Sequence, residues 1–375
     1  MASLYIHIPF CLGKCEYCSF NSYAGMESLF SRYVAALKKE IVKHSFEGAG
    51  ERLETVFLGG GTPSMLSSDQ IGEIINCCRQ YHGIAENAEI SMEANPKTIN
   101  FMKLLQLRQA GITRLSIGVQ SFIDHELDLL GRLHSAQDSW ECVRDAHAAG
   151  FSNINLDLMY GIPRQNAEHW RWNVESALSL MVPHLSLYQL TMEEGTPMAR
   201  RVDNGTLELP DDDEVMLMDE ISARLCGESG LFQYEISNYG RQGFYCWHNI
   251  NYWHNLDYLA AGAGAVGYQD GRRWKNIEDP LHYCEAVEAD ESPVQESEKL
   301  DNEASFRESV VTGLRMVSGV ACAPLYERFG LNLRDYYGDI LIPMLTNGLV
   351  EFTSSHFRLT KKGRRVANQI LAELV

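Results

Sequence analysis

The stretch from Leu4 to Phe20, LYIHIPFCLGKCEYCSF, decides the fold class and most of the chemistry of this chain. Its apolar run LYIHI predicts a buried β-strand, and three cysteines follow that strand directly. Cys11, Cys15 and Cys18 are spaced Cys-x3-Cys-x2-Cys on one short loop. Three such thiolates match three corners of a 4Fe-4S cluster and leave the fourth iron open to a chelating molecule. The alternative is zinc, which needs a fourth ligand, and His7 could supply one.

Beyond this stretch, short β-rich runs alternate with helical segments along more than half of the chain. The segments between them show apolar spacing of three and four, as in Ile71, Ile74 and Ile75. The further strand-like runs lie at residues 55–59, 89–94, 114–119, 154–161 and 184–190. The alternation predicts six βα units with a parallel sheet. A partial (β/α)6 barrel and a doubly wound sheet both remain open, and both place functional groups at the C-terminal ends of strands.

Three domains are expected from changes in composition. Residues 1–235 form the (β/α)6 core, and residues 236–300 form a bridging segment whose acidic stretch, Glu285 to Glu303, we interpret as a solvated linker or helix face. Residues 301–375 are expected to form a smaller helical, winged-helix-like domain. In that domain LVEF and FRLT predict a hairpin around the turn residues Thr353 to Ser355.

The overall charge and the cysteine content limit the classes of partner. The 375 residues include 32 Lys and Arg against 50 Asp and Glu, a formal charge of −18, which argues against nucleic acid as a partner. No apolar run approaches the roughly 18 residues of a membrane helix. No signal peptide is recognisable, so we expect a cytoplasmic protein whose ten cysteines are reduced.

Several motifs in chain order extend the pattern of the cysteine loop: LGGGTP, EANP, GVQSF, LGRLH, DLMYGIP and HNINYW. With them, the sequence resembles the radical S-adenosylmethionine (SAM) superfamily. Within it, the chain is most similar to the branch of oxygen-independent coproporphyrinogen III oxidases and related haem chaperones. The resemblance implies a 4Fe-4S cluster on Cys11, Cys15 and Cys18. It also implies SAM, whose methionine end chelates the unique iron and whose cleavage gives a 5′-deoxyadenosyl radical.

The candidate SAM residues lie at or near strand ends. Glycine at positions 59–61, followed by Thr62, lets backbone approach a ligand closely, and we expect these amides to form a nest for the amino or carboxylate group of SAM. The resemblance implies that Tyr5, Glu93, Gln120, Arg132 and Asp157 contact or lie close to SAM, and Gly60 belongs to the same candidate set. It also relates Tyr17, Gly61 and Thr62 to a second SAM molecule, whose binding stays open.

Departures from the oxidase pattern favour a haem chaperone. Phe20 stands where the oxidases carry a fourth cysteine, and the first strand begins at Leu4 without their N-terminal extension. The motif HNxxYW, from His248 to Trp253, resembles the haem-chaperone branch. We expect His248 to be an axial haem ligand, with Cys246 as the alternative.

The expected function is therefore to bind haem as cargo and transfer it to haem-requiring apoproteins. The alternatives are a coproporphyrinogen III dehydrogenase, which decarboxylates propionate side chains, and a radical SAM methyltransferase. The sequence leaves open whether the chain is an enzyme, whether its client is membrane-associated and whether it forms a homodimer.

Overall fold

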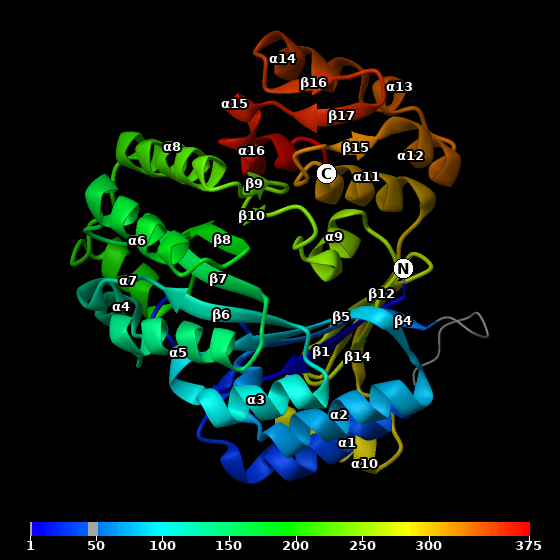
Figure 1. Ribbon diagram of the computed structural model, residues 1–375. Coiled ribbons are helices and arrows are strands. Elements are labelled where there is room, and N and C mark those ends of the chain that lie inside the picture. Colours follow the sequence, from blue (N-terminus) through cyan, green and yellow to red (C-terminus); the bar gives the residue numbers. More distant parts are fainter. Residues whose placement is uncertain (1, 44–51) are drawn as a thin grey trace.

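The molecule is built around a nine-stranded mixed sheet (Figure 1). The computed structural model describes residues 2–43 and 52–375. All the predicted strands are confirmed, and they pair in chain order and in parallel. These strands are β1 (Ser3–Ile8), β4 (Leu53–Gly60), β5 (Ile84–Ala94), β6 (Arg114–Gln120), β7 (Asn153–Tyr160) and β8 (His184–Gln189).

The strand order decides between the two topologies that the sequence left open. Each predicted strand neighbours the next one along the chain, so the sheet winds in one direction and has no switch point of the doubly wound kind. β11 (Leu259–Ala261) adds a parallel strand beside β1, and β10 (Asn238–Gly240) and β9 (Phe232–Gln233) extend the other side antiparallel. In the described residues β11 and β9 are the two ends of the strand order, so the barrel is partial.

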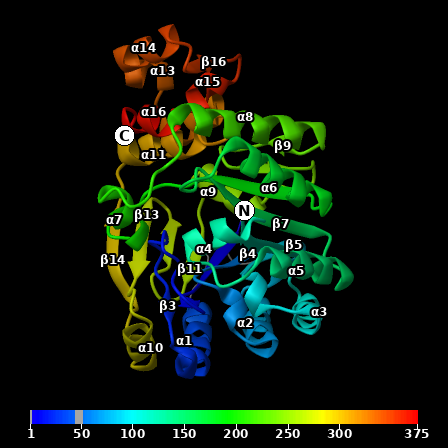
Figure 2. The same cartoon turned by 90° about the vertical axis from the view of Figure 1, so that its left-hand side faces the viewer.

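Helices cover the outside of the sheet (Figures 1 and 2). They are α1 (Phe30–Lys43), α2 (Ser68–Tyr81), α3 (Phe101–Ala110), α4 (Asp124–Leu130), α5 (Ala136–Ala148), α6 (Ala167–Ser179), α7 (Pro197–Asp203), α8 (Asp212–Glu228) and α10 (Pro280–Glu288). The predicted apolar face of α2 is buried, and a capping box of Ser67 and Gln70 starts the helix. Trp170 on α6 is fully buried and donates from Nε1 to the Met218 carbonyl of α8, at 3.0 Å.

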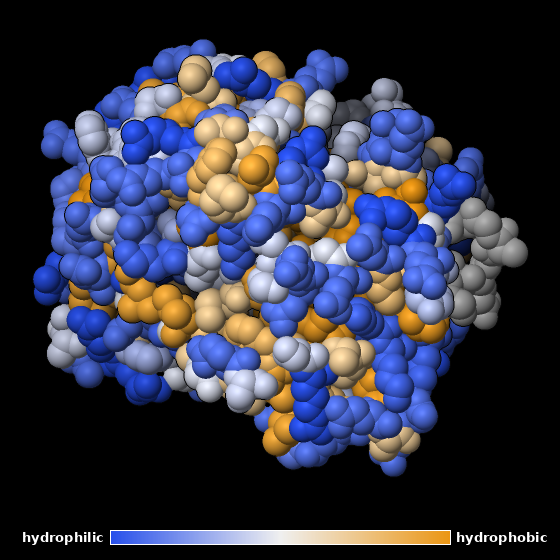
Figure 3. Space-filling model, turned by 60° about the horizontal axis from the view of Figure 1, so that its bottom comes forward, coloured by the Kyte–Doolittle hydropathy of each residue, from blue (hydrophilic) through white to orange (hydrophobic). Residues whose placement is uncertain are grey.

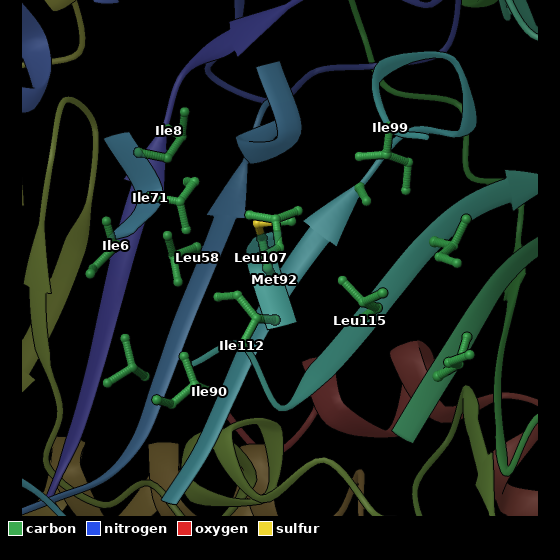
Figure 4. Close-up of a cluster of buried hydrophobic side chains, with 14 of the residues drawn as sticks. Ile6, Ile8, Leu58, Ile71, Ile90, Met92, Ile99, Leu107, Ile112 and Leu115 are labelled. Carbon is green, nitrogen blue, oxygen red and sulfur yellow. The ribbon is translucent and has the colours of Figure 1, made fainter. Parts of the chain in front are cut away.

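The main core lies between this helical layer and the sheet. Figure 4 shows Ile6 and Ile8 of β1 beside Ile71 of α2, and Met92 of β5 beside Leu107 of α3. All of these side chains are fully buried. Removing such an aliphatic side chain costs roughly 2–5 kcal/mol, so this layer fixes the strands whose far ends carry the polar side chains described below.

The segment 236–300 is folded rather than a linker. It contributes β10 and β11 to the main sheet, and it holds the short helix α9 (Trp247–Trp253). Its acidic part is also ordered, because Val294–Lys299 forms β14, an exposed edge strand beside β13 (Arg272–Asn276), which pairs on its other side with β12 (Val266–Gln269). The linker interpretation was therefore wrong for residues 294–299, because backbone pairing with β13 holds these solvated acidic side chains on a strand. The alternative of a helix face is confirmed for Glu285 and Glu288, which lie exposed on α10.

The C-terminal region, at the top of Figure 1, has a separate hydrophobic core. Its elements are α11 (Asn302–Gly313), β15 (Val320–Ala321), α12 (Cys322–Phe329), α13 (Leu333–Tyr337), α14 (Leu341–Thr346), β16 (Val350–Phe352), β17 (His356–Leu359), α15 (Lys361–Arg364) and α16 (Ala367–Ala372). The predicted hairpin is confirmed as β16 and β17. The helical stretch of residues 333–346 is broken into α13 and α14 at Gly338, whose φ is 46°. The likeness to a winged helix and the three-domain division stay predictions.

Polar contacts join this region to the barrel. Arg365 forms ion pairs with Asp219 and Glu220 of α8, and the Ile236 amide donates to the Arg315 carbonyl. The face that comes forward in Figure 3 is mostly hydrophilic, with small scattered apolar patches. Among the described residues, no helix combines the length and apolarity that crossing a bilayer requires.

Candidate functional site

The predicted cluster and SAM residues, which are spread over more than 150 positions of the sequence, line one pocket of about 520 Å³. They are Tyr5, Cys11, Cys15, Tyr17, Cys18, Gly60, Gly61, Thr62, Glu93, Gln120, Arg132 and Asp157. The parallel sheet explains the gathering, because the C-terminal ends of β1, β4, β5, β6 and β7 meet at one mouth of the partial barrel.

The cysteine loop is fixed on several sides. Cys11 ends β2 (Phe10–Cys11), which pairs with β3 (Tyr23–Ala24), and the Cys18 amide donates to the Cys15 carbonyl at 3.3 Å. Between them the Glu16 amide donates to the Leu130 carbonyl at 3.1 Å. Because β3 and the end of α4 both form backbone bonds to the loop, the fold holds in place the loop that presents the three sulfurs.

The three cysteine sulfurs do not have the close spacing that the ligands of a single ion need. Cys11, Cys15 and Cys18 are not among the described groups whose ligand atoms all lie within 4.8 Å of one another, a spacing that a single ion requires. In a 4Fe-4S cluster each thiolate binds a different iron, so wider separation is expected. The alternative ligand His7 is also engaged, because its Nδ1 accepts from the Tyr5 hydroxyl at 3.0 Å and its Nε2 donates to the Asn21 carbonyl at 2.9 Å.

The glycine-rich turn after β4 supports the cysteine loop through its amides. The Gly61 amide donates to the Ile8 carbonyl at 2.9 Å, and the Thr62 amide donates to the Phe10 carbonyl at 2.7 Å. A Cβ at Gly61 would lie 2.8 Å from the Phe10 carbonyl oxygen, so glycine is required for this close approach. The Gly60 amide donates to Glu93 at 3.1 Å. These three amides are therefore already used as donors and form no free amide nest, while a contact of the turn with SAM stays a prediction.

Two carboxylates face the same buried part of the pocket. Burial first, and then the charge of Asp157, raises the pKa of Glu93 to about 8. Burial also raises the pKa of Asp157, although hydrogen bonds from Asn155 and Ser116 oppose this. A cationic ligand would favour the ionised form of both groups. The sulfonium and ammonium groups of SAM meet that requirement.

Arg132 adds a positive charge on the cluster side of the pocket. Its Nη2 donates to the Gly118 carbonyl at 2.7 Å and its Nη1 donates to Cys15 Sγ at 3.4 Å. Its Nε is buried without a hydrogen-bond partner, so one donor is available for an anionic group such as the carboxylate of a methionine.

Gln120 ends β6 at a φ of 68°, a conformation rare for residues other than glycine. Such strain is often retained at ligand sites.

Two tyrosines complete the lining. Tyr5 is bonded to His7 and lies against Phe57, with ring centroids 6.3 Å apart. Tyr17 lies between Cys15 and Cys18, and burial raises its pKa although Arg132 opposes the shift. Both phenols therefore stay neutral at physiological pH. Tyr17 can donate a hydrogen bond to a ligand, whereas the single proton of Tyr5 is donated to His7.

His248 does not line this pocket, and its environment contradicts the expected role as a haem ligand. The side chain is fully buried; its Nδ1 is 2.8 Å from Thr55 Oγ1 and its Nε2 is 2.8 Å from the Tyr252 hydroxyl. Burial, and then the charge of Arg114, lowers the pKa of His248 to about 3. With both nitrogens hydrogen-bonded inside the protein, the ring has no free position for iron. Its observed contacts orient Tyr252.

Cys246, the alternative haem ligand, is also fully buried. Its Sγ contacts Glu89 Oε1 at 3.5 Å, and burial raises the pKa of the thiol to about 12. Glu89 also accepts from the backbone amides of Trp247 and His248, which holds the first turn of α9. These contacts make Cys246 a neutral packing residue rather than a thiolate ligand.

Sequence reasoning missed several residues of the pocket. Asn249 and Tyr252 of the HNxxYW motif line it beside Tyr5, although the motif was assigned to haem. Arg114 also lines it; this side chain is only 2 % exposed and faces the carboxylates of the pocket. Arg114 begins β6, and nothing in the periodicity distinguishes it from a surface arginine.

Comparisons with known proteins identify the relatives of this chain. Residues 5–176 match the family model of the radical SAM superfamily, and residues 300–366 match the model of the HemN C-terminal domain. The haem chaperone HemW of Bacillus subtilis is 34% identical over 99% of this chain and 98% of its own length. HemW of Escherichia coli is 40% identical over 72% of this chain and 71% of its own length.

Among solved structures, coproporphyrinogen III oxidase (HemN) from Escherichia coli, described as a radical SAM enzyme, superimposes with a TM-score of 0.86. The match covers 100% of this chain and 89% of HemN at 24% identity, so it establishes the fold alone. The relatives at 34% and 40% identity also establish the family. The chain belongs to the HemW family of radical SAM proteins.

Proposed function

We propose that this protein is a haem chaperone that binds haem and transfers it to haem-requiring apoproteins. The observation that carries the proposal is the similarity to proteins named haem chaperone HemW over nearly the whole chain, including the C-terminal region. Phe20 supports it as well, because the cysteine that the resemblance leads one to expect in an oxidase is missing there.

In this proposal a 4Fe-4S cluster sits on Cys11, Cys15 and Cys18, and SAM occupies the pocket beside it. When both are bound, the cluster, once reduced, would supply the electron that cleaves SAM, which is the chemistry of the superfamily. The Nε of Arg132 offers a hydrogen bond to the SAM carboxylate. Glu93 and Asp157 compensate the positive charges, and Tyr5 and Tyr252 close the buried side of the pocket.

For haem we propose the apolar rim of the same pocket rather than His248. Leu12, Phe20 and Leu133 line the pocket, yet they are 45%, 66% and 57% exposed. A porphyrin is a flat apolar ring with anionic propionates, and exposed apolar side chains beside a cation suit both features. Lys14 supplies that cation within the rim, where its Nζ donates to the Phe20 carbonyl at 3.3 Å.

The function is tested anaerobically with the cluster-reconstituted protein and SAM. Haem is supplied in one series, followed by a haem-requiring apoprotein, and coproporphyrinogen III with reductant is supplied in the other. We expect haem to move to the apoprotein and no protoporphyrinogen to form. Decarboxylation of coproporphyrinogen at a catalytic rate would replace the chaperone by the dehydrogenase, and failure to take up haem would also reject the proposal.

The rim predicts which substitutions reduce haem binding. Phe20→Ser with Leu133→Ser removes two apolar contacts, each worth roughly 1.5 kcal/mol or more, so we expect at least tenfold weaker haem binding in a spectrophotometric titration. Met181→Ser is the matched control, because Met181 is 76% exposed and does not line the pocket. Equal haem affinity in both variants would move the haem site elsewhere.

A substitution of His248 separates a haem ligand from a buried positioning residue. His248→Ala removes the contacts to Thr55 and Tyr252, so we expect a lower melting temperature with an unchanged haem absorption spectrum. The free energy of unfolding should fall by about 2 kcal/mol. A variant that folds but shows an altered haem spectrum would restore His248 as the ligand.

A further inference from the structure

A second cluster of potential metal ligands lies outside the pocket. His125 and Glu126 are in the first turn of α4, and His169 is in the first turn of α6. The ligand atoms that these three side chains offer all lie within 4.8 Å of one another, and no other group of three in the described residues meets this spacing. The rings of His125 and His169 meet edge to face, with centroids 5.3 Å apart.

Glu126 is a buried carboxylate in which one oxygen accepts three hydrogen bonds and the other accepts none. Its side chain is 0% exposed, and its Oε2 accepts hydrogen bonds from Ser121 Oγ at 2.6 Å, Gln165 Nε2 at 3.0 Å and Asn173 Nδ2 at 3.0 Å. Its Oε1 is buried and has no hydrogen-bond partner. Every donor to this carboxylate is neutral, so the charge needs compensation from the side that Oε1 faces.

The atom that Oε1 faces is also without a hydrogen bond. His169 Nδ1 lies 3.3 Å from Glu126 Oε1, and it too is buried and unpartnered because the geometry does not suit a hydrogen bond. Two ligands of a tetrahedral zinc ion, each bonded at about 2.1 Å, are separated by about 3.4 Å. The observed separation of Nδ1 and Oε1 is therefore close to that of two ligands sharing one ion.

We propose that His125, Glu126 and His169 bind a divalent cation of the zinc type. A His2Glu set is a common three-ligand arrangement for zinc, with water in the fourth position. The exposed side chain of His125 lies on the solvent side, which provides the entry path. The three neutral donors to Oε2 act as the outer shell that orients the carboxylate ligand, as in established zinc sites.

The site would connect two parts of the barrel. Glu126 is tied to Ser121, which directly follows Gln120 at the end of β6, while His169 belongs to the helix that follows β7. Asn173 of α6 strengthens this connection, because its Oδ1 accepts from the Phe122 amide at 2.5 Å. A bound ion would hold α4 and α6 together and fix the turn that carries Gln120 into the pocket. The proposal does not depend on haem transfer.

The test uses the full-length, cluster-reconstituted protein, so that the three cluster cysteines are occupied by iron. After equilibration with zinc chloride and dialysis, zinc and iron are counted per chain by mass spectrometry. We expect one zinc more in the wild type than in His125→Ala or His169→Gln, with equal iron. Because His125 is exposed, its variant should fold normally. Losing a ligand should weaken zinc binding by more than the roughly 10- to 100-fold typical of an outer-shell change.

His282→Ala is the matched control, because His282 also faces a carboxylate, Asp279, at 3.7 Å, but outside the triad. It should keep the extra zinc. X-ray absorption at the zinc edge should show nitrogen and oxygen ligands without sulfur, and zinc should raise the melting temperature of the wild type only. Equal zinc in wild type and triad variants, or a sulfur shell, overturns the proposal and leaves His169 and Glu126 as a simple ion pair.

Discussion

Cys15→Ala should abolish retention of the iron–sulfur cluster. The expected result after anaerobic reconstitution is a protein that folds but lacks iron, acid-labile sulfide and the broad visible absorption of thiolate-bound clusters. Cys15 is the middle cysteine of the loop, and it is the one whose sulfur accepts a hydrogen bond from Arg132, at 3.4 Å. Its removal leaves two thiolates and an unpaired buried guanidinium donor.

A cysteine outside the loop provides the control. Cys322 is partly exposed like the cluster cysteines, but it begins α12 in the C-terminal region. Cys322→Ala should therefore retain the full iron and sulfide content. Retention of the cluster in Cys15→Ala would reject the assignment of the three cysteines, and loss of the cluster in both variants would show that the cysteine substitutions act through folding.

Glu93→Gln should weaken SAM binding and remove its pH dependence. In the free protein the pKa of Glu93 is about 8, so the group is mostly neutral at pH 7. A cationic ligand binds the carboxylate better, and the affinity should therefore rise with pH up to about 8 and then level off. Above that pH the variant should bind SAM roughly thirtyfold more weakly, which corresponds to about 2 kcal/mol.

Glutamine preserves the shape of the side chain, and its oxygen can still accept from the Gly60 amide. Glu86→Gln is the control, because Glu86 lies on the same strand, β5, and is exposed. Calorimetric titrations of SAM between pH 6.5 and 9 compare the three proteins. A wild-type affinity that is independent of pH, or parallel pH profiles for the wild type and Glu93→Gln, would contradict the role of Glu93.

The raised pKa of Glu93 also makes the folding stability depend on pH. The pKa of Glu93 is raised in the folded state above its ordinary value of 4.5, so the folded protein holds a proton that the unfolded chain releases. Without ligand, the free energy of unfolding should therefore fall as pH rises from about 4.5 to about 8. Glu93→Gln should lose this part of the pH dependence, which denaturant titrations at several pH values can measure.

The strand positions and the gathering of the pocket residues followed from the sequence for a simple reason. In a singly wound parallel sheet every C-terminal strand end reaches the same edge, so strand prediction alone brings Glu93, Gln120 and Asp157 together. The cysteine loop is local, and its spacing is visible without any tertiary information. The order of the strands in the sheet could not be predicted from the sequence, because periodicity does not report which strands are neighbours.

The errors concern residues whose roles depend on burial. His248 has the chemistry of a haem ligand, but its ring is enclosed against β4, where it stacks on Phe57 and is hydrogen-bonded to Thr55. The amides after β4 could have donated hydrogen bonds to SAM, but those of Gly61 and Thr62 donate to the carbonyls of Ile8 and Phe10 instead. Arg114 was missed because only the packed sheet shows that its charge is buried beside carboxylates.

By itself, the sequence determined the local chemistry of this protein: the three-cysteine loop, the strand periodicity and the polar residues at strand ends. Only the tertiary structure decided which donors and acceptors remain free, since hydrogen bonding between distant segments occupies His248, Cys246 and the amides of Gly61 and Thr62. It also brought His125 and Glu126 against His169, residues more than 40 positions apart. Contacts of this kind arise from packing α4 against α6, which residue spacing does not encode.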